Sequence, residues 1–357
     1  MRIERITSWD DLAAMASYWE AVAGEGVPVF LSWPWVRIWQ RHLAKGQPWV
    51  LAVWLDGELA GLAPWGIERR RGMRWLRFLG DGPLLPDHLD ILAHPAHKMQ
   101  VGRAAVEHLR RYRRDWDVLS LRSIAQASPL PGLLAASLRC HFRPPIVCPY
   151  IPLEGVPDWE TFLRTRISAS MRKKGLRYLE NLLKRRFPGQ VSYTRISHPE
   201  DLPGAMETFF QLHLRRWHAR GMSTPLEDER LRDFHREMAV IALERDWLGL
   251  YQLRVGDTVI ATQYGFHFQN IFYDYQHAFH PDWGDYSPGR LLIAYIVAEC
   301  IRLGRREYDF LEGEEAYKFS WTREVRRNPY VVAGTGLRGR LWMEAVSLRD
   351  RLAGMRP

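Results

Sequence analysis

Residues 249–268 read GLYQLRVGDTVIATQYGFHF, and residues 50–65, VLAVWLDGELAGLAPW, repeat the same pattern in the first half of the chain. Each stretch places a turn, Gly256-Asp257 or Asp56-Gly57, between two alternating apolar runs. Such a dipeptide between alternating runs is a strong signal for a β-hairpin. A hairpin that recurs once in each half indicates an internal repeat, and the repeat decides the fold.

The elements around the two hairpins also follow the same order. Before each hairpin, an Arg-Ile pair ends a strand and an Asp-Leu pair opens an amphipathic helix, with Ser8 or Ser197 expected as its cap. After each hairpin, a His-Pro pair leads into a helix, which runs into a strand at 116–121 or 307–311. Each half therefore predicts strand, helix, hairpin, strand, helix and strand. This is an α/β (α+β) arrangement, a mixed sheet covered by helices.

The predicted organisation has three parts: a domain over 1–145, a domain over 146–328, and a strand and helix within 329–357. Prolines at 144, 145, 149, 152 and 157 mark the join and are expected to exclude long regular structure there. A basic helix is expected over 159–186, and a terminal helix over 341–353. The run GTGLRG at 334–339 matches a dinucleotide fingerprint, but too few residues follow it for the rest of that unit, so we interpret it as a turn.

Composition agrees with a globular protein of two domains. The 357 residues exceed the roughly 250–300 at which a single core stops growing. A share of 46% hydrophobic and 25% charged residues excludes a largely disordered or fibrous chain. The net charge of +9 favours phosphate-bearing partners, without choosing among a nucleotide cofactor, RNA and an anionic lipid.

Several absences in the sequence bound the class of protein. The 3 cysteines are widely spaced, which predicts neither disulfides nor a zinc site. The charged N-terminal segment has no apolar core typical of a signal peptide, and no window approaches the roughly 20 apolar residues that span a bilayer. We therefore expect a cytoplasmic protein without a transmembrane segment. The histidine pairs lack a third ligand nearby, so no metal site is expected.

Three clusters in the second half carry a family resemblance: Leu212-His213 with Arg216-Trp217 and Arg220-Gly221, then residues 286–289 (YSPG), then residues 308–313 (YDFLEG) with Tyr317, Lys318 and Trp321. With them, residues 159–321 resemble the GNAT acetyltransferase-like (CelD-like) family associated with cellulose and exopolysaccharide biosynthesis, and more distantly the FemABX peptidyltransferases. The resemblance implies tandem GNAT-like domains in a FemABX-like architecture, with a degenerate first copy and the reactive site in the second. It also implies transfer of an acyl or aminoacyl group onto an amine.

The segment Ser287-Pro288-Gly289-Arg290 heads a predicted helix, and the resemblance implies that it holds the pyrophosphate of coenzyme A. Ser is favoured as a helix cap and Pro at the first helical position, while the free N–H groups and the helix dipole attract anions. Gly289 would let a phosphate approach the backbone, and Arg290 would add positive charge. We assign Tyr275 and His277, on the preceding aromatic strand, to the same donor site. Acyl-CoA is the expected co-substrate, and no permanently bound cofactor is expected.

Catalytic candidates follow the strand at 307–311. A carboxylate of Glu312, Glu314 or Glu315 would take a proton from the attacking amine if burial raised its pKa, although a solvated acidic loop fits each of them equally well. The resemblance implies that Tyr317 protonates a departing thiolate, and Lys318 would stabilise developing negative charge. We expect the principal cleft to be lined by this segment together with residues 273–277 and 287–290.

Four further residues are assigned to the acceptor, and the acceptor is expected to be an amine of a small molecule, a sugar or a polysaccharide intermediate. These residues are Arg172, His213, Trp217 and Asp274. His213 also fits a core histidine with satisfied hydrogen bonds, and the basic run fits a solvated helix face. Two other functions stay open: aminoacyl transfer from tRNA, favoured by the basic helix, and a non-catalytic binding or scaffold protein. Lys318 and the acidic cluster favour an enzyme, because a scaffold needs neither.

Overall fold

The computed structural model describes residues 1–24 and 26–354 and divides the chain into two compact units. The N-terminal unit comprises Met1–Ile146 together with Arg327–Pro357, and the C-terminal unit comprises Val147–Arg326. The last residues of the chain, which the sequence sets apart as a third segment, therefore belong to the first unit.

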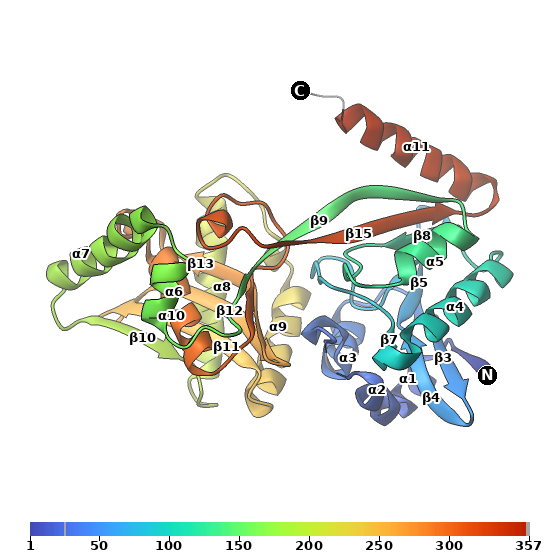
Figure 1. Cartoon of the computed structure of the whole chain (residues 1–357), viewed down its shortest axis with the longest axis horizontal. Coiled ribbons are helices and arrows are strands. Elements are labelled where there is room, and N and C mark those ends of the chain that lie inside the picture. The colour runs from blue at the N-terminus through green and yellow to red at the C-terminus, as the bar shows by residue number, and fades with distance from the viewer. Residues whose placement is uncertain (25, 355–357) are drawn as a thin grey trace. The chain divides into compact units, whose positions relative to one another are not determined.

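The C-terminal unit is built on a mixed sheet with the strand order β10-β11-β12-β13-β14-β9. Neighbouring strands are antiparallel except β13 and β14, which run parallel (Figure 1). The hairpin at residues 249–268 forms β11 and β12 as predicted. The strands are β9 (Cys140–Pro152), β10 (Val191–Arg195), β11 (Leu248–Val255), β12 (Thr258–Phe268), β13 (Ile271–Phe279) and β14 (Glu307–Asp309).

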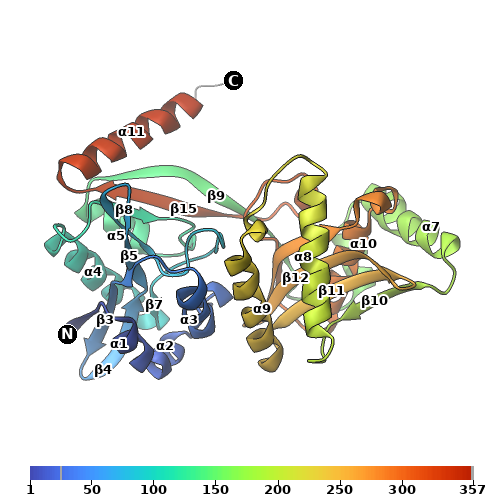
Figure 2. The same ribbon diagram turned by 180° about the vertical axis from the view of Figure 1, so that it is seen from behind.

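Helices cover both faces of this sheet. On one face, α8 (Leu202–His218) and α9 (Glu229–Glu244) lie side by side, which Figure 2 shows from behind. On the other face α10 (Pro288–Arg302) crosses the strands, and α6, η2 and α7 lie on its outer side (Figure 1). Apolar residues of α10, such as Ile296 and Val297, form a core with Phe272 and Tyr308 of the sheet, and all four are fully buried. The remaining helical segments are α6 (Trp159–Thr165), η2 (Met171–Arg177), α7 (Tyr178–Arg186), η3 (Pro225–Glu227), η4 (Pro281–Tyr286) and η5 (Lys318–Ser320).

The N-terminal unit contains one sheet of order β1-β3-β4-β7, and a second run of strands of order β15-β8-β6-β5-β2. Its strands are β1 (Arg2–Ile6), β2 (Gln47–Pro48), β3 (Val50–Leu55), β4 (Glu58–Ala63), β5 (Trp65–Arg70), β6 (Met73–Phe78), β7 (Leu92–Ala93), β8 (Val118–Leu121) and β15 (Val325–Gly334). Its helices are α1 (Trp9–Ala14), α2 (Ala16–Val22), η1 (Val29–Leu31), α3 (Trp33–His42), α4 (Pro95–Arg111), α5 (Leu130–Ser137) and α11 (Gly336–Gly354).

Strand order confirms the internal repeat. The sequence β1-β3-β4-β7 in one unit matches β10-β11-β12-β13 in the other, with every neighbouring pair antiparallel in both. A long helix then follows, α4 or α10, and leads to the next strand, β8 or β14. The chain therefore folds as two copies of one mixed α/β unit, the tandem architecture that the repeated hairpins predict.

Prolines near the join do not exclude regular structure, and that expectation is wrong. Residues 140–152 form the 13-residue strand β9, which contains Pro144, Pro145, Pro149 and Pro152. The fixed φ of proline suits extended backbone, and proline lacks only the N–H donor. Its carbonyl group can still pair: that of Pro149 accepts the N–H of Phe310 at 3.0 Å.

Other local predictions also need correction. Ser8 caps α1 as expected, with its hydroxyl accepting from the N–H groups of Asp10 and Asp11, but α8 begins only at Leu202 and Ser197 caps nothing. The basic helix over 159–186 is interrupted into α6, the π-helical η2 and α7. The terminal helix starts at Gly336, inside the glycine run taken as a turn. Across residues 1–24 and 26–354, no helix is both long and apolar enough to cross a membrane.

Candidate active site

Pairing between β13 and β14 stops after three residues. Residues 271–273 pair with residues 307–309, after which β13 continues to Phe279 while β14 ends. The polar residues proposed from sequence follow this point on both strands, at 274–277 and at 312–318. The end of the parallel pairing therefore brings the two halves of the candidate site together.

Asp274 is the first residue of β13 beyond the pairing, and it is only 4% exposed. Gln263 donates to one carboxylate oxygen, and the hydroxyl group of Tyr308 donates to the other at 2.9 Å. Burial raises the pKa of Asp274 to about 7, although the hydrogen bond from Tyr308 and the charge of Lys318 both lower it. A carboxyl group with a pKa near neutrality is suited to general acid–base chemistry.

Lys318 lies at the start of η5 and is 3% exposed. Its ammonium group donates to the backbone carbonyl of Glu312 at 2.6 Å and lies 3.0 Å from a carboxylate oxygen of Glu315. A longer contact of 3.5 Å reaches the carbonyl oxygen of Leu311. The ammonium group therefore holds the segment 311–315 in a compact loop, besides carrying charge toward Asp274.

Gly313 makes this loop possible. Its φ of +129° lies in a region that side chains rarely adopt, and a Cβ there would lie 2.2 Å from Glu315 Oε2 and 2.8 Å from Lys318 Nζ. Leu311 also has a positive φ, +56°, and its N–H donates to Asp309 at 2.8 Å. The loop after β14 is thus strained backbone held in place by side chains, a feature that clusters at functional sites.

Tyr317, His277 and Arg216 contact one another in a second cluster. The rings of Tyr317 and His277 meet edge to face with centroids 5.3 Å apart. Arg216, on α8, donates to the carbonyl oxygen of His277 at 3.1 Å, and its Nε is buried without a partner in the described part of the chain. Desolvation, reinforced by Arg216 and Lys318, lowers the pKa of His277 to about 3. Burial raises the pKa of Tyr317, and so does the charge of Asp274.

The predicted start of α10 is confirmed, with Pro288 at the first helical position, but Ser287 does not cap the helix as expected. Ser287 adopts a left-handed conformation, φ 46°, and its side chain accepts no capping bond. Around Gly289 the backbone is open, because a Cβ would meet only Phe279 at 3.7 Å. Arg290 reaches toward η2, with a guanidinium nitrogen 3.5 Å from the Cβ position of Gly175.

The acidic cluster lacks the burial that a base would need. Glu314 and Glu315 are exposed, and Glu315 pairs with Lys318. Glu312 is half-buried and offers Lys318 its backbone carbonyl. At the ends of β13 and β14, burial raises the pKa of the carboxyl group of Asp274, to which the sequence assigns an acceptor role instead.

The other sequence candidates make their contacts with other groups. His213 is buried, hydrogen-bonded to the Thr224 hydroxyl at 2.9 Å and stacked on Trp217, but its Nδ1 is buried without a partner in the described part of the chain, so its hydrogen bonds are not all satisfied. Tyr275 packs among the aromatic residues of α9 and β12. Arg172 donates to the carbonyl oxygen of Leu163. In the described residues, no three His, Cys, Asp or Glu side chains gather as a metal site requires.

The principal cleft is not where the sequence predicts it. A cavity of about 230 Å³ in the C-terminal unit lies between α10 and the helices α6, η2 and α7, with Arg172 and Tyr295 in its wall. The larger cavity, about 700 Å³, belongs to the N-terminal unit. Neither cavity is lined by residues 273–277, 287–290 or 312–318, the three segments expected to line the cleft.

Sequence reasoning missed two partners of Asp274, Gln263 and Tyr308, and did not assign Arg216 a role. A polar residue inside the apolar strand β12 was the available signal for Gln263, which is 1% exposed. Tyr308 lies within the motif at 308–313, but only the strand pairing shows which carboxylate it contacts.

Comparison with known proteins identifies the second copy. Residues 170–319 match the family model of an acetyltransferase (GNAT) domain. A search of curated proteins finds no match. Among solved structures, the chain resembles FemX with a TM-score of 0.63 at 10% identity, over 93% of this chain and 97% of FemX. These values show a shared fold.

Two further solved structures have the same fold. A conserved protein of unknown function from Bacteroides thetaiotaomicron matches with a TM-score of 0.57 at 15% identity, over 94% of this chain and 100% of its own. The C-terminal domain of a protein described as a lysylphosphatidylglycerol synthetase, from Agrobacterium fabrum, matches with a TM-score of 0.56 at 11% identity, over 94% and 96%. Both matches cover nearly the whole chain.

Proposed function

Because residues 170–319 form an acetyltransferase (GNAT) domain within a tandem GNAT fold distantly related to FemABX proteins, we propose that the protein is an N-acyltransferase that moves an acyl group from an acyl-CoA thioester to an amine. The acceptor is an amine of a small molecule, a sugar or a polysaccharide intermediate. The observation that carries this proposal is the buried carboxyl group of Asp274, with a pKa of about 7, at the point where β13 and β14 cease to pair.

The start of α10 is the proposed anchor for the donor's phosphates. Pro288 has no N–H, and the N–H groups of Arg290 and Leu291 donate to the carbonyl oxygen of Ser287, so the N–H of Gly289 is the group at this helix start that would meet an anion. The open space beside Gly289 leaves room for a phosphate against the backbone, and Arg290 lies next in the chain. Coenzyme A would supply the thioester that makes the acyl carbon electrophilic.

The residues around Asp274 have distinct proposed roles. As the amine attacks the thioester carbonyl carbon, the carbon–sulfur bond breaks, the amine loses a proton and the thiolate gains one. Asp274 accepts the amine proton and the Tyr317 hydroxyl group supplies a proton to the departing thiolate, after which the proton held by Asp274 returns to the tyrosinate. Burial raises the pKa of Tyr317 and so keeps its hydroxyl group protonated until the thiolate leaves. Lys318 holds the loop 311–315 and keeps a positive charge near Asp274.

A direct test measures thiol release from acetyl-CoA in the presence of an amine panel: glucosamine, lysine and spermidine. We expect release that depends on one class of amine and that falls about 10²-fold or more in Asp274→Asn. Thermal shift with acetyl-CoA provides a second readout, since a ligand that binds the folded state raises its stability. Absence of both stabilisation and thiol release, with longer acyl-CoA donors also tried, would reject the proposal.

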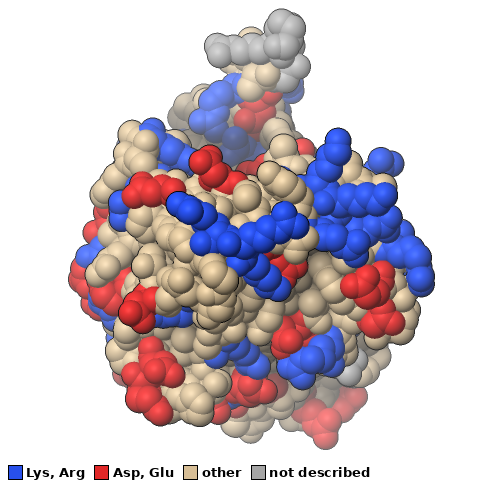
Figure 3. Space-filling view, turned by 90° about the vertical axis from the view of Figure 1, so that its left-hand side faces the viewer, with Lys and Arg blue, Asp and Glu red and all other residues tan. Residues whose placement is uncertain are grey.

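Aminoacyl transfer from tRNA is a second candidate, favoured by the basic surface of η2 and α7. Figure 3 shows Lys and Arg side chains gathered on one face of the molecule. On η2 and α7 the exposed members are Lys173, Lys174, Arg177, Lys184, Arg185 and Arg186. Tight, salt-dependent binding of tRNA that is lost in Lys173→Ala/Lys174→Ala would favour this donor over acyl-CoA.

A further inference from the structure

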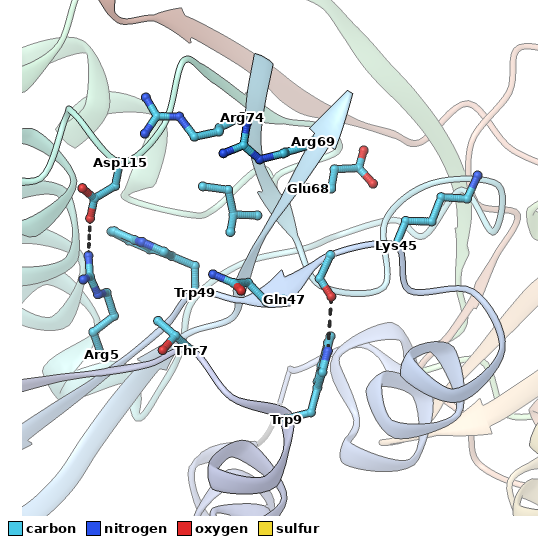
Figure 4. A pocket seen from close by; sticks show the side chains of 12 residues that line it. Arg5, Thr7, Trp9, Lys45, Gln47, Trp49, Glu68, Arg69, Arg74 and Asp115 are labelled. Carbon is cyan, nitrogen blue, oxygen red and sulfur yellow. Dashed lines mark hydrogen bonds and ion pairs between the residues drawn. The ribbon is translucent and has the colours of Figure 1, made fainter. Parts of the chain in front are cut away.

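The larger cavity, about 700 Å³, lies wholly in the N-terminal unit, and acyl transfer as proposed makes no use of it. Its wall comes from the end of β1, the start of α1, the segment around β2, the β5–β6 hairpin and the residue Asp115 before β8. Figure 4 shows the side chains of these elements around one hollow. The volume falls within the roughly 300–1,000 Å³ typical of small-molecule sites.

Two arginines in the wall, Arg5 and Arg74, are each held by an acidic residue, Asp115 and Asp117 respectively. Arg5 forms an ion pair with Asp115, and its guanidinium group also lies over the Trp49 ring, 5.5 Å from the centroid. Arg74 binds Asp117 through Nε at 3.1 Å and Nη2 at 2.9 Å. Each guanidinium group carries five N–H donors, so both retain donors beyond those used by the carboxylate. Their positions are fixed before any ligand arrives.

The side chains of two further cations, Lys45 and Arg69, are exposed and have no hydrogen-bonding or ion-pair partner in the described part of the chain. The wall thus holds four cationic side chains against two acidic ones, Glu68 and Asp115. Glu68 is itself paired with Arg77 at 3.3 Å. The cavity therefore has an excess of positive charge, part of which no side chain among residues 1–24 and 26–354 neutralises.

The backbone around the cavity is tightly fitted. The indole N–H of Trp9 donates to the carbonyl oxygen of Gly46 at 3.2 Å. A Cβ on Gly46 would lie 2.1 Å from the carbonyl oxygen of Ile67, so the segment carrying Lys45 lies directly against β5. Trp49, 2% exposed, forms the buried part of the wall. A preformed wall lowers the ordering cost of binding.

We propose that this cavity is a second ligand site, which binds a small molecule through a phosphate or carboxylate group. Guanidinium groups held in fixed orientation match the geometry of such oxyanions, and Lys45 and Arg69 supply the charge that is still uncompensated. The site is distinct from the helix start proposed for the acyl donor, which belongs to the other unit. It can be tested without any acyl transfer.

The test is titration calorimetry on the full chain at fixed ionic strength, with inorganic pyrophosphate in one arm and citrate in the other. Lys45→Ala/Arg69→Ala removes two cations from the wall. Arg103→Ala/Arg110→Ala is the matched control, because it removes two exposed cations from α4 in the same unit.

We expect at least one of the two anions to bind. Binding of pyrophosphate would show that the site recognises phosphate groups, and binding of citrate that it recognises carboxylate groups. The wall variant should weaken its binding about 10-fold or more, as the loss of charged hydrogen bonds does, while the control retains the affinity of the unaltered chain. Failure of both anions to bind, or equal weakening in the two variants, would overturn the proposal. Neither result depends on thiol release from acetyl-CoA, so the experiment tests this site independently of the proposed activity.

Discussion

The hydroxyl group of Tyr308 donates a hydrogen bond of 2.9 Å to Asp274, across two strands whose last paired residues are Tyr273 and Asp309. This bond stabilises the charged form of a carboxyl group that burial favours as the neutral form. The balance places the pKa of Asp274 at about 7. A single hydrogen bond between neighbouring strands therefore tunes the group proposed as the base.

The first prediction concerns the pH dependence of kcat/KM. A base with a pKa of about 7 gives activity that falls as pH drops below that value. Asp274→Asn should lower kcat/KM about 10²-fold or more and abolish this acidic limb. Tyr308→Phe should keep the fall in kcat/KM at acidic pH but move it to higher pH, because this variant lacks the hydrogen bond that lowers the pKa of Asp274. An unchanged limb in both variants would exclude Asp274 as the base.

Asp274 also links stability to pH. Its pKa is raised from the ordinary value of 3.8 to about 7 in the folded chain. Its contribution to stability is therefore present at low pH and is lost as pH rises through about 7. The stability of Asp274→Asn relative to the unaltered chain should increase by about 1 kcal/mol or more between pH 5 and pH 8. Urea unfolding at both pH values measures the free energy of unfolding of each protein. A difference between the two proteins that is the same at both pH values would contradict the raised pKa of Asp274.

Buried histidines should make the protein sensitive to acid. Burial lowers the pKa of His235 to about 3 and that of His267 to about 2, against 6.5 for an exposed ring. Each contributes stability above pH 6.5 that is lost as pH falls toward the folded-state pKa. We expect the melting temperature to fall between pH 6.5 and pH 4.5, and the proton signals of these rings to stay constant over that range. Rings that titrate near 6.5 would refute the burial.

Gly313→Ala tests the loop that follows β14. The added Cβ would collide with Glu315 Oε2 and Lys318 Nζ at a φ of +129°, so the loop must rearrange. Activity should fall about 10-fold or more while the melting temperature changes by only a few degrees, because the loop is local. Gly304→Ala is a suitable control, since it also has a positive φ but nothing within 4 Å of the added atom. Equal effects of the two changes would mean that backbone strain alone matters.

Lys318→Met separates charge from packing. The ammonium group bonds the carbonyl of Glu312 and a carboxylate oxygen of Glu315, so its loss should cost about 1–3 kcal/mol of stability as well as activity. Turnover should fall about 10²-fold. Lys318→Arg keeps the charge and changes the geometry, so it should recover stability more than turnover. Full turnover in Lys318→Met would remove Lys318 from the mechanism.

Much of the fold was predictable, because its strongest signals are local. Two turns, Asp56-Gly57 and Gly256-Asp257, set hairpins whose alternation is visible in the sequence, and a helix follows each further strand. Errors arose where backbone geometry overrides composition. The prolines of β9 fit extended backbone, and Ser197 lies too far ahead of α8 to cap it.

The site was harder to predict because its chemistry depends on long-range pairing. Lys318, Tyr317 and His277 were accessible from sequence. The charge of Lys318 acts on Asp274, that of Asp274 acts on Tyr317, and the ring of His277 contacts that of Tyr317. Burial of Asp274, in contrast, follows from a strand register that joins residues 34 positions apart. The position of Asp274 inside an apolar strand separates it from the three glutamates that follow β14, but that position alone does not show which side chains contact its carboxylate.

The return of residues 327–354 to the N-terminal unit has a consequence for biosynthesis. Residues 331–334 of β15 pair with β8, and the Trp342 ring of α11 packs against the Trp75 ring at 4.8 Å. A ribosome delivers these residues only after it has made the whole of 147–326. The second unit is continuous in the chain and can fold as it emerges, whereas the first waits with the edge of β8 unpaired. The N-terminal unit, whose first residues are synthesised before all others, is thus the unit that completes its folding last.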